Sequence, residues 1–257
     1  MKYPVILVHG IVIKDFLFIK AFGKIEKILK KEGYLVFTSK TDGFGTIENN
    51  ASILKAQIEE ILEKNKVDKV NIIAHSKGGL DSKYMIKHLN MEDKVASLTT
   101  LCTPHKGSKI ADNILKLPKW IIKFLAFWIN LFYKICRDKK PDCISVAKQL
   151  STINSVEEET FLYSNKIYCQ SYSTTLKKSR DDFIMGIPLI FSKRFENDSS
   201  DGLVSKESSK FENYRGNCLD ESISHSEIID YSLSKKKRDK VRKFYKDLCK
   251  DLESKGY

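Results

Sequence analysis

Ser76 has the neighbours that a serine nucleophile needs. It lies in Ala74-His-Ser-Lys-Gly78, between an apolar stretch typical of a buried strand and a helical pattern that extends to about Leu89. A sharp strand-to-helix turn lifts a serine hydroxyl above a sheet, and the turn needs small residues two places before and after the serine. The following helix would direct its N-terminal dipole and N–H groups at the charge that develops during acyl transfer. We therefore interpret Ser76 as a nucleophile, with a serine that only caps the helix as the alternative.

Acyl transfer also needs two hydrogen-bond donors for the oxyanion. One is typically the backbone N–H after the nucleophile, and the other comes from a loop at the end of an earlier strand. Lys77 and Ile11 occupy these positions, since Ile11 follows the apolar run from Pro4 to Val8 and the pair His9-Gly10. Their backbone N–H groups would act, and His9 is interpreted as a structural histidine that shapes the loop.

A histidine must accept the serine proton, because imidazole has a suitable pKa near neutrality. Of the five histidines, His225 alone lies late enough for the order nucleophile, acid, base that this architecture uses. Its acidic partner should precede it in a turn that directs a carboxylate at the imidazole. Asp201, at the start of Asp-Gly-Leu-Val, fits best; Asp198 is the nearest alternative, and Asp-Gly also occurs in ordinary turns.

The rest of the pattern supplies the elements that would position these residues. Short continuous apolar runs are typical of parallel strands covered on both faces, and they alternate here with helical patterns. This alternation predicts an α/β fold with a mostly parallel, doubly wound sheet, and one domain over residues 1–257 accounts for the length. Strands are expected at residues 4–8, 34–38, 69–74 and 95–101, and helices at residues 19–31, 46–64, 80–89 and 235–255.

Helical patterns replace the expected short crossover between residues 110 and 159, which predicts an inserted helical lid. Apolar residues from Leu117 to Ile135 recur at helical spacing, with lysines such as Lys119 and Lys123 on the other side. The run is shorter than the roughly 20 apolar residues of a membrane span. We interpret the stripe as a lid face that contacts lipid or membrane, with ordinary core packing as the alternative.

The overall charge bears on partners. Lysine and arginine (45) outnumber aspartate and glutamate (33), which gives a net charge of +12. Peripheral contact with an anionic membrane is therefore one expectation, and a lysine-rich surface that is simply solvated is the alternative. Nucleic acid is not an expected partner, because no zinc-finger, helix-turn-helix or RNP-like pattern occurs.

Cysteine usage and the N-terminal residues suggest a compartment. Six scattered cysteines without a CxxC pair predict reduced thiols. The apolar run before His9 is too short for the core of a signal peptide. We therefore expect a cytoplasmic protein that could associate with a membrane surface.

These motifs together resemble the bacterial true lipases of the α/β-hydrolase fold, over nearly the whole chain. The resemblance implies that Asp201 is the triad acid, although Ser200 stands where the family has asparagine, and that the helical insert is a lid. No cysteine in residues 201–207 matches the disulfide of some relatives. The matching segments are Pro4-Val-Ile-Leu-Val-His-Gly10, Ala74-His-Ser-Lys-Gly-Gly79, Thr99-Thr-Leu-Cys-Thr-Pro-His-Lys-Gly-Ser108, Asp201-Gly-Leu-Val-Ser205 and the region of His225.

The resemblance also implies a structural calcium ion that braces the loop of the catalytic histidine. Asp182 and Glu227 occupy positions comparable to the two acidic ligands, and calcium takes hard oxygen ligands. Glu227 is longer than the usual aspartate, and solvated acids in a loop are the alternative.

The sequence thus predicts a lipase-like serine carboxylic-ester hydrolase that cleaves fatty-acyl esters, such as acylglycerols, through an acyl-enzyme on Ser76. Its chemistry requires no cofactor. A thioesterase, phospholipase or acyltransferase that uses the same triad is the first alternative. A non-catalytic protein that binds membrane surfaces is the alternative from another class.

Overall fold

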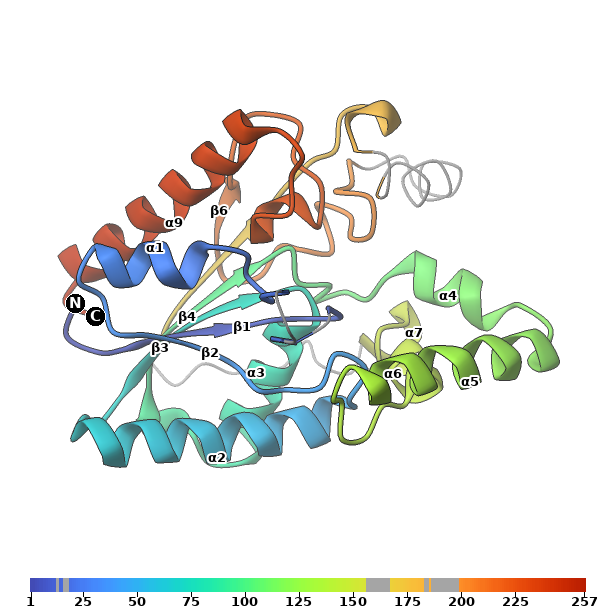
Figure 1. Cartoon of the computed structure of the whole chain (residues 1–257), viewed down its shortest axis with the longest axis horizontal. Coiled ribbons are helices and arrows are strands. Elements are labelled where there is room, and N and C mark those ends of the chain that lie inside the picture. Colours follow the sequence, from blue (N-terminus) through green and yellow to red (C-terminus); the bar gives the residue numbers. More distant parts are fainter. Residues whose placement is uncertain (13, 16–18, 156–166, 183–184, 186–198) are drawn as a thin grey trace.

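A parallel β-sheet forms the centre of the molecule in the computed structural model (Figure 1). The structure describes residues 1–257 except 13, 16–18, 156–166, 183–184 and 186–198. Six strands pair in the order β2-β1-β3-β4-β5-β6, and every pairing is parallel. They are β1 (Val5–Val8), β2 (Val36–Thr38), β3 (Val70–His75), β4 (Val95–Leu101), β5 (Tyr168–Ser173) and β6 (Asn213–Asn217).

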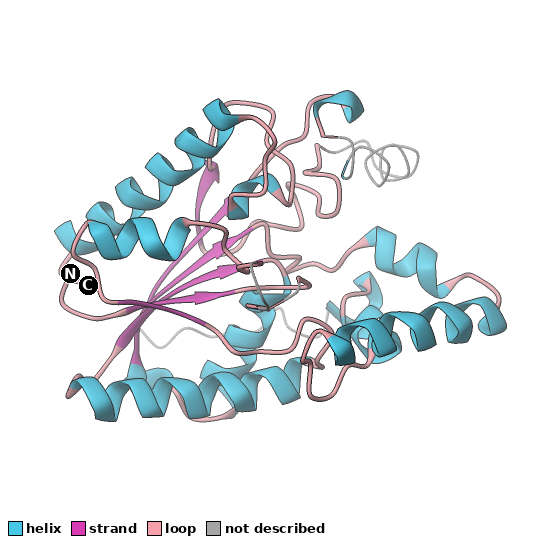
Figure 2. Cartoon of the chain, in the orientation of Figure 1, coloured by secondary structure: helices cyan, strands magenta, loops and turns pink. Residues whose placement is uncertain are grey.

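Helices cover both faces of this sheet (Figure 2), as the apolar runs predict. Because successive side chains of a strand point to opposite faces, Val5 and Leu7 of β1 pack into a core with α1 and α9, while Ile6 and Val8 pack into a core with α2 and α3. The doubly wound architecture predicted from the sequence is confirmed. These covering helices are α1 (Ile25–Lys31), α2 (Ile47–Asn65), α3 (Lys77–His88) and α9 (Lys235–Ser254).

The first helix begins later than the sequence predicts, at Ile25 instead of about Ile19. Gly23 has a φ of +50°, which a helix does not accommodate. The next backbone N–H, that of Lys24, donates to the Asp230 carboxylate over 2.9 Å. Contact with a residue 206 positions away therefore decides where the helix starts.

The order of the strands determines where a site can form. From β1 the chain first adds β2 on one side and then returns to add β3 and the later strands on the other. In open α/β sheets, ligands bind outside the carboxyl ends of the strands where the order reverses. This point lies between β1 and β3, whose carboxyl ends lead into His9 and Ser76.

A group of helices lies between β4 and β5, beyond the carboxyl ends of the strands (Figure 1). It corresponds to the predicted insertion at residues 110–159, of which 156–159 lie outside the described residues. Short 3-10 helices occur elsewhere at Glu92–Lys94, Ser179–Asp181 and Glu227–Ile229. The inserted helices are α4 (Lys109–Leu115), α5 (Lys119–Ile135), α6 (Cys143–Gln149) and α7 (Thr152–Ser155).

Helix α5 exposes its large apolar side chains. Ala126 is the buried residue of this helix, so core packing does not account for the aromatic stripe. Within the described residues, no helix combines the length and apolar character needed to cross a bilayer. The most exposed large apolar residues of α5 are Trp120 (73%), Ile135 (66%), Phe127 (61%) and Phe124 (60%).

Candidate active site

The turn between β3 and α3 holds Ser76 in a strained conformation. Its φ of 55° and ψ of −132° lie in a region that non-glycine residues rarely adopt. The neighbouring glycines allow close backbone packing, since a Cβ on Gly78 would lie 2.6 Å from the carbonyl oxygens of Val8 and His9. The Ser76 side chain makes no capping hydrogen bond to its helix. Ser76 therefore occupies the N-cap position of α3 without capping the helix through its hydroxyl.

One hydrogen-bonded chain joins the three residues that the sequence suggested for the triad. His225 Nε2 lies 2.8 Å from Ser76 Oγ, and His225 Nδ1 lies 2.7 Å from Asp201 Oδ2. The other carboxylate oxygen accepts the backbone N–H groups of Leu203 and Val204 at 2.9 and 2.8 Å. The turn after Asp201 thus orients its carboxylate. Asp198, the alternative acid, lies outside the described residues.

The tautomer of His225 follows from its partners. An ionised carboxylate only accepts hydrogen bonds, so Nδ1 donates to Asp201. In the neutral imidazole, Nε2 is then unprotonated and accepts the hydrogen bond of Ser76 Oγ. This arrangement allows the imidazole to remove the serine proton.

The loop after β1 packs against Ser76. A Cβ on Gly10 would lie 2.7 Å from Ser76 Cβ and 3.0 Å from the Lys77 backbone nitrogen. Glycine is needed at position 10 because the loop and the Ser76 turn lie too close for a side chain. The loop that contains Ile11 therefore lies beside the first N–H of α3, where the predicted oxyanion donors would have to meet.

The side chain of Lys77 has a role that the sequence did not suggest. It is buried, and its Nζ contacts both carboxylate oxygens of buried Asp81 at 2.7 and 3.0 Å. Burial raises the pKa of Asp81 to about 6, although Lys77 acts in the opposite direction. Asn50 donates a further hydrogen bond to Asp81 over 2.9 Å. This buried group fixes the first turn of α3.

Two further residues next to the triad were not among the predicted site residues. His75 Nε2 donates to the His225 carbonyl oxygen over 3.0 Å and so supports the backbone of His225 from the end of β3. Cys102, after β4, has its thiol within 4.8 Å of ligand atoms of Asp201 and His225. Their place at the ends of neighbouring strands could have pointed to the site, but nothing in the sequence orients their side chains.

The two acids suggested for calcium are engaged in hydrogen bonds and an ion pair. Asp182 Oδ2 accepts the hydroxyl of Ser224 over 2.5 Å. Both carboxylate oxygens of Glu227 contact the ammonium of Lys237, at 2.9 and 2.8 Å. Calcium needs six to eight oxygen ligands with free lone pairs, and a carboxylate already paired with an ammonium does not offer them. This donor set does not fit a calcium ion.

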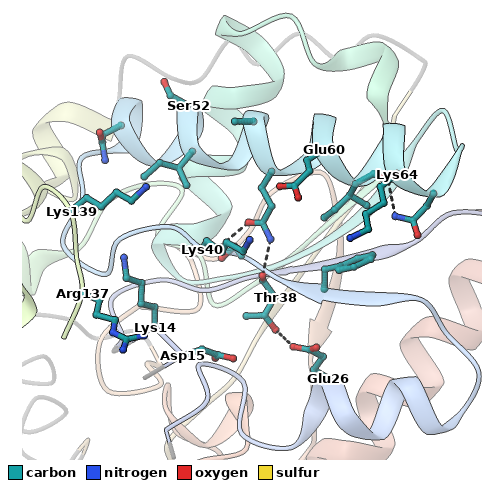
Figure 3. A pocket seen from close by; sticks show the side chains of 18 residues that line it. Lys14, Asp15, Glu26, Thr38, Lys40, Ser52, Glu60, Lys64, Arg137 and Lys139 are labelled. Atoms are coloured by element: carbon teal, nitrogen blue, oxygen red, sulfur yellow. Dashed lines mark hydrogen bonds between the residues drawn. The ribbon is translucent and has the colours of Figure 1, made fainter. Parts of the chain in front are cut away.

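A separate groove of about 1090 Å³ runs along the edge strand β2 (Figure 3). No triad residue lines it. The Gln57 side chain donates to the Thr38 carbonyl oxygen and accepts the Lys40 N–H, at 2.9 and 2.8 Å. These bonds use the outward backbone groups of the edge strand, which makes pairing with another strand unfavourable.

Comparison with known proteins identifies the family. Residues 4–175, more than half of the chain, match the family model described as palmitoyl protein thioesterase. The chain belongs to the palmitoyl protein thioesterase family. Among curated relatives, it is 30% identical to triacylglycerol lipase 2 of Saccharomyces cerevisiae over 234 residues, and 29% identical to a triacylglycerol lipase of Pseudarthrobacter phenanthrenivorans over 170 residues. These alignments cover 86% and 62% of the chain, and 65% and 53% of the relatives.

Solved structures confirm the α/β-hydrolase fold of this family member. The lipase of Staphylococcus hyicus superposes with a TM-score of 0.75 at 14% identity, over 98% of this chain and 95% of that one. A mature lipase of Bacillus licheniformis gives a TM-score of 0.64 at 21% identity, over 90% and 88% of the two chains.

Gly10→Ala is expected to lower kcat for ester hydrolysis by roughly 10- to 100-fold, less than complete loss of an oxyanion donor. The added methyl group would meet Ser76 Cβ at 2.7 Å and push the two loops apart. Steady-state kinetics with a p-nitrophenyl ester measure the effect, and KM should stay within about twofold. An unchanged kcat together with a lowered melting temperature would mean that Gly10 serves the fold alone.

The free energy of unfolding is expected to decrease as the pH falls from about 6.5 toward 4. Burial lowers the pKa of His9 to about 4, and lowers the pKa of His75 and of His105 well below 6.5. In this range the unfolded chain takes up protons that the folded chain does not, so acid favours unfolding. Each unit by which the pKa of a histidine differs between the folded and the unfolded chain changes the free energy of unfolding by up to ~1.4 kcal/mol.

Urea unfolding at pH 7 and pH 5 measures this difference. His105→Gln should reduce it, whereas His88→Gln, which changes an exposed histidine on α3, should leave it unchanged. Equal stability of the wild-type protein at both pH values would contradict the interpretation that these histidines are buried and neutral.

Proposed function

We propose that this protein is a serine carboxylic-ester hydrolase that cleaves fatty-acyl esters through an acyl-enzyme on Ser76. One observation carries the proposal: the hydrogen-bonded chain from Ser76 Oγ through His225 to Asp201 at the carboxyl ends of the strands. The names of the curated relatives, which are triacylglycerol lipases, support an acyl ester as the substrate. The chain spans 65% of the length of the first of these relatives and 53% of the second.

The chemistry follows from the contacts of each residue. His225 Nε2 takes the proton of Ser76 Oγ as the oxygen attacks the ester carbonyl. Asp201 stabilises the resulting imidazolium through Nδ1, and the backbone N–H groups of Ile11 and Lys77 stabilise the oxyanion. The imidazolium then protonates the departing alcohol. Water, deprotonated by His225, hydrolyses the acyl-enzyme, and no cofactor takes part.

An acyl thioester is the second candidate substrate, which the description of the matching family model favours. The same serine attacks the same kind of acyl carbon, and only the leaving group changes from an alcohol to a thiol. The triad therefore suits both reactions, and the contacts of the leaving group decide between them.

We infer that the inserted helices act as a lid and contact an anionic lipid surface. The exposed aromatic side chains of α5 suit the interfacial region of a bilayer, and exposed lysines accompany them. Burial of the aromatic side chains and attraction of the lysines to anionic headgroups would then both favour binding to the membrane. The lysines are Lys116, Lys119, Lys123 and Lys134.

All six cysteines are free thiols. Disulfides are rare where glutathione and thioredoxin keep thiols reduced. This supports the inference that the protein acts in a reducing compartment such as the cytoplasm.

A fluorophosphonate probe should label Ser76, and mass spectrometry should locate the adduct there. Ser76→Ala should abolish labelling and lower kcat by roughly a million-fold, the effect of losing a triad nucleophile. The control Ser52→Ala changes an exposed serine on α2 and should retain both.

The substrate class is decided by comparing kcat/KM for oxygen esters and thioesters of matched acyl length, from butyryl to palmitoyl. Hydrolysis of oxygen esters supports the proposal. Turnover of thioesters alone would shift the assignment to the second candidate. Binding of vesicles by Ser76→Ala, with no turnover by the wild-type protein, would instead favour a membrane-binding protein without activity.

The double variant Trp120→Gln/Trp128→Gln is expected to bind anionic vesicles at least about tenfold more weakly, because each buried aromatic side chain contributes ~1.5–3 kcal/mol. Sedimentation with phosphatidylglycerol vesicles measures the change, and turnover of a soluble short-chain ester should be retained. Leu233→Gln is the matched control, since Leu233 is fully exposed away from the insert. Equal binding by the double variant would exclude α5 as the contact surface.

A further inference from the structure

A buried carboxylate holds the loop that carries His225. Glu227 lies two residues after the base and is 3% exposed. Its Oε2 accepts the backbone N–H of Ser224 over 3.0 Å, and its Oε1 accepts the hydroxyl of Ser232 over 2.7 Å. In return, the Glu227 N–H donates to Ser224 Oγ over 3.2 Å. The carboxylate thus joins the residues before His225 to the segment that leads into α9.

An ammonium neutralises this carboxylate. Lys237 Nζ, from the first turn of α9, lies 2.9 and 2.8 Å from the two oxygens of Glu227. The two side chains are 18% and 5% exposed, so their charges are mostly shielded from water. Each oxygen of Glu227 accepts one further hydrogen bond besides that of Lys237. The carboxylate has a full set of partners from within the chain.

Asp182 approaches the same loop from another direction. Its Oδ2 accepts the hydroxyls of Ser224 and Ser226, at 2.5 and 3.3 Å, which lie on either side of the base. Ser224 therefore contacts both acids, one through its hydroxyl and the other through its backbone N–H. Ser224 thus links the two acids.

We propose that the ammonium of Lys237 is the cation that braces the His225 loop, and that it makes the site independent of calcium. In this arrangement Lys237 is a positioning residue: it neutralises Glu227, which holds Ser224 and hence the backbone of His225. The proposal rests on the proposed function in that His225 is taken to be the base.

The physical reasoning concerns charge and geometry. A buried carboxylate without a partner is costly, and removing one member of a buried pair leaves an uncompensated charge. A calcium ion would need to displace the ammonium of Lys237 and the hydrogen bonds from Ser224 and Ser232 before it could coordinate the oxygens of Glu227. An ammonium has three donors and suits two carboxylate oxygens, with no requirement for free lone pairs elsewhere. Glutamate in place of a shorter aspartate gives the carboxylate the reach to meet α9.

The first experiment uses the wild-type protein. Excess EGTA should leave both the melting temperature and kcat unchanged, and calorimetric titration with calcium chloride should give no binding heat. A loss of either quantity on chelation, restored by calcium, would overturn the proposal. These measurements need no variant, and the melting temperature and titration need no turnover.

The second experiment tests the positioning role. Lys237→Met should lower kcat by about 10- to 100-fold, the range for displaced catalytic groups, with KM within about twofold. Lys237→Arg should restore most of kcat, because arginine keeps the charge. The control Lys236→Met removes an exposed neighbouring charge and should match the wild-type protein. Wild-type kcat in Lys237→Met would overturn the proposal.

A double variant covers the case in which Lys237→Met does not fold. Glu227→Gln/Lys237→Met leaves no buried charge alone, and it should fold while kcat stays reduced. Wild-type kcat in this variant would also overturn the proposal. If the wild-type protein hydrolyses no ester, the proposed function fails, whereas the comparison of melting temperatures between Lys237→Met and Lys236→Met still tests the brace.

Discussion

The carboxyl ends of β1 and β3 approach each other so closely that a methyl group would not fit between them, and the candidate site depends on this contact. Gly78 packs on the carbonyl oxygens of Val8 and His9, and Gly10 packs on Ser76. The contact forces the strained turn at the serine and brings the loop of Ile11 beside the first N–H of α3. Parallel pairing of β1 with β3 sets the contact, since register aligns Val8 with Ala74.

Two ion pairs between a lysine and a buried carboxylate hold the parts that surround this contact. Lys77, which follows Ser76, pairs with Asp81, and Lys237 pairs with Glu227, two residues after His225. Taking such charges out of water is costly, so their value lies in fixing geometry more than in raising stability. A lysine that is buried beside a carboxylate has few alternative positions, and the loop attached to it shares that restriction.

The insert is attached to the site by the same kind of interaction. The Asp42 carboxylate accepts a hydrogen bond from Lys14 Nζ over 2.7 Å. It also accepts hydrogen bonds from the backbone N–H groups of Lys139 and Lys140, over 2.8 Å each. Asp42 therefore links the loop after β1, the loop before α2 and the segment that follows α5. The base of the insert is thus anchored near the loop after β1, while the aromatic face of α5 is exposed. This division suits the proposed contact of α5 with lipid.

Much of the fold and of the candidate site could be predicted from local sequence pattern. The apolar runs around Val5 and Val95 predict buried parallel strands because both faces of such strands are covered. The strand β5 was not predicted, because its residues include polar Gln170 and Ser171, which are buried only because partners such as Thr99 and Phe211 meet them. Local pattern carries no information about such partners.

The same distinction applies to the site. By itself, the sequence determined the residue types and their order along the chain, which singled out Ser76, Asp201 and His225. Only the tertiary structure decided which groups meet: that Lys77 turns inward to Asp81, that His75 donates to the backbone of His225, and that Lys237 pairs with the carboxylate suggested for calcium. The physical reason is that hydrogen bonds and ion pairs act over about 3 Å, and folding alone brings residues so distant in sequence within that range.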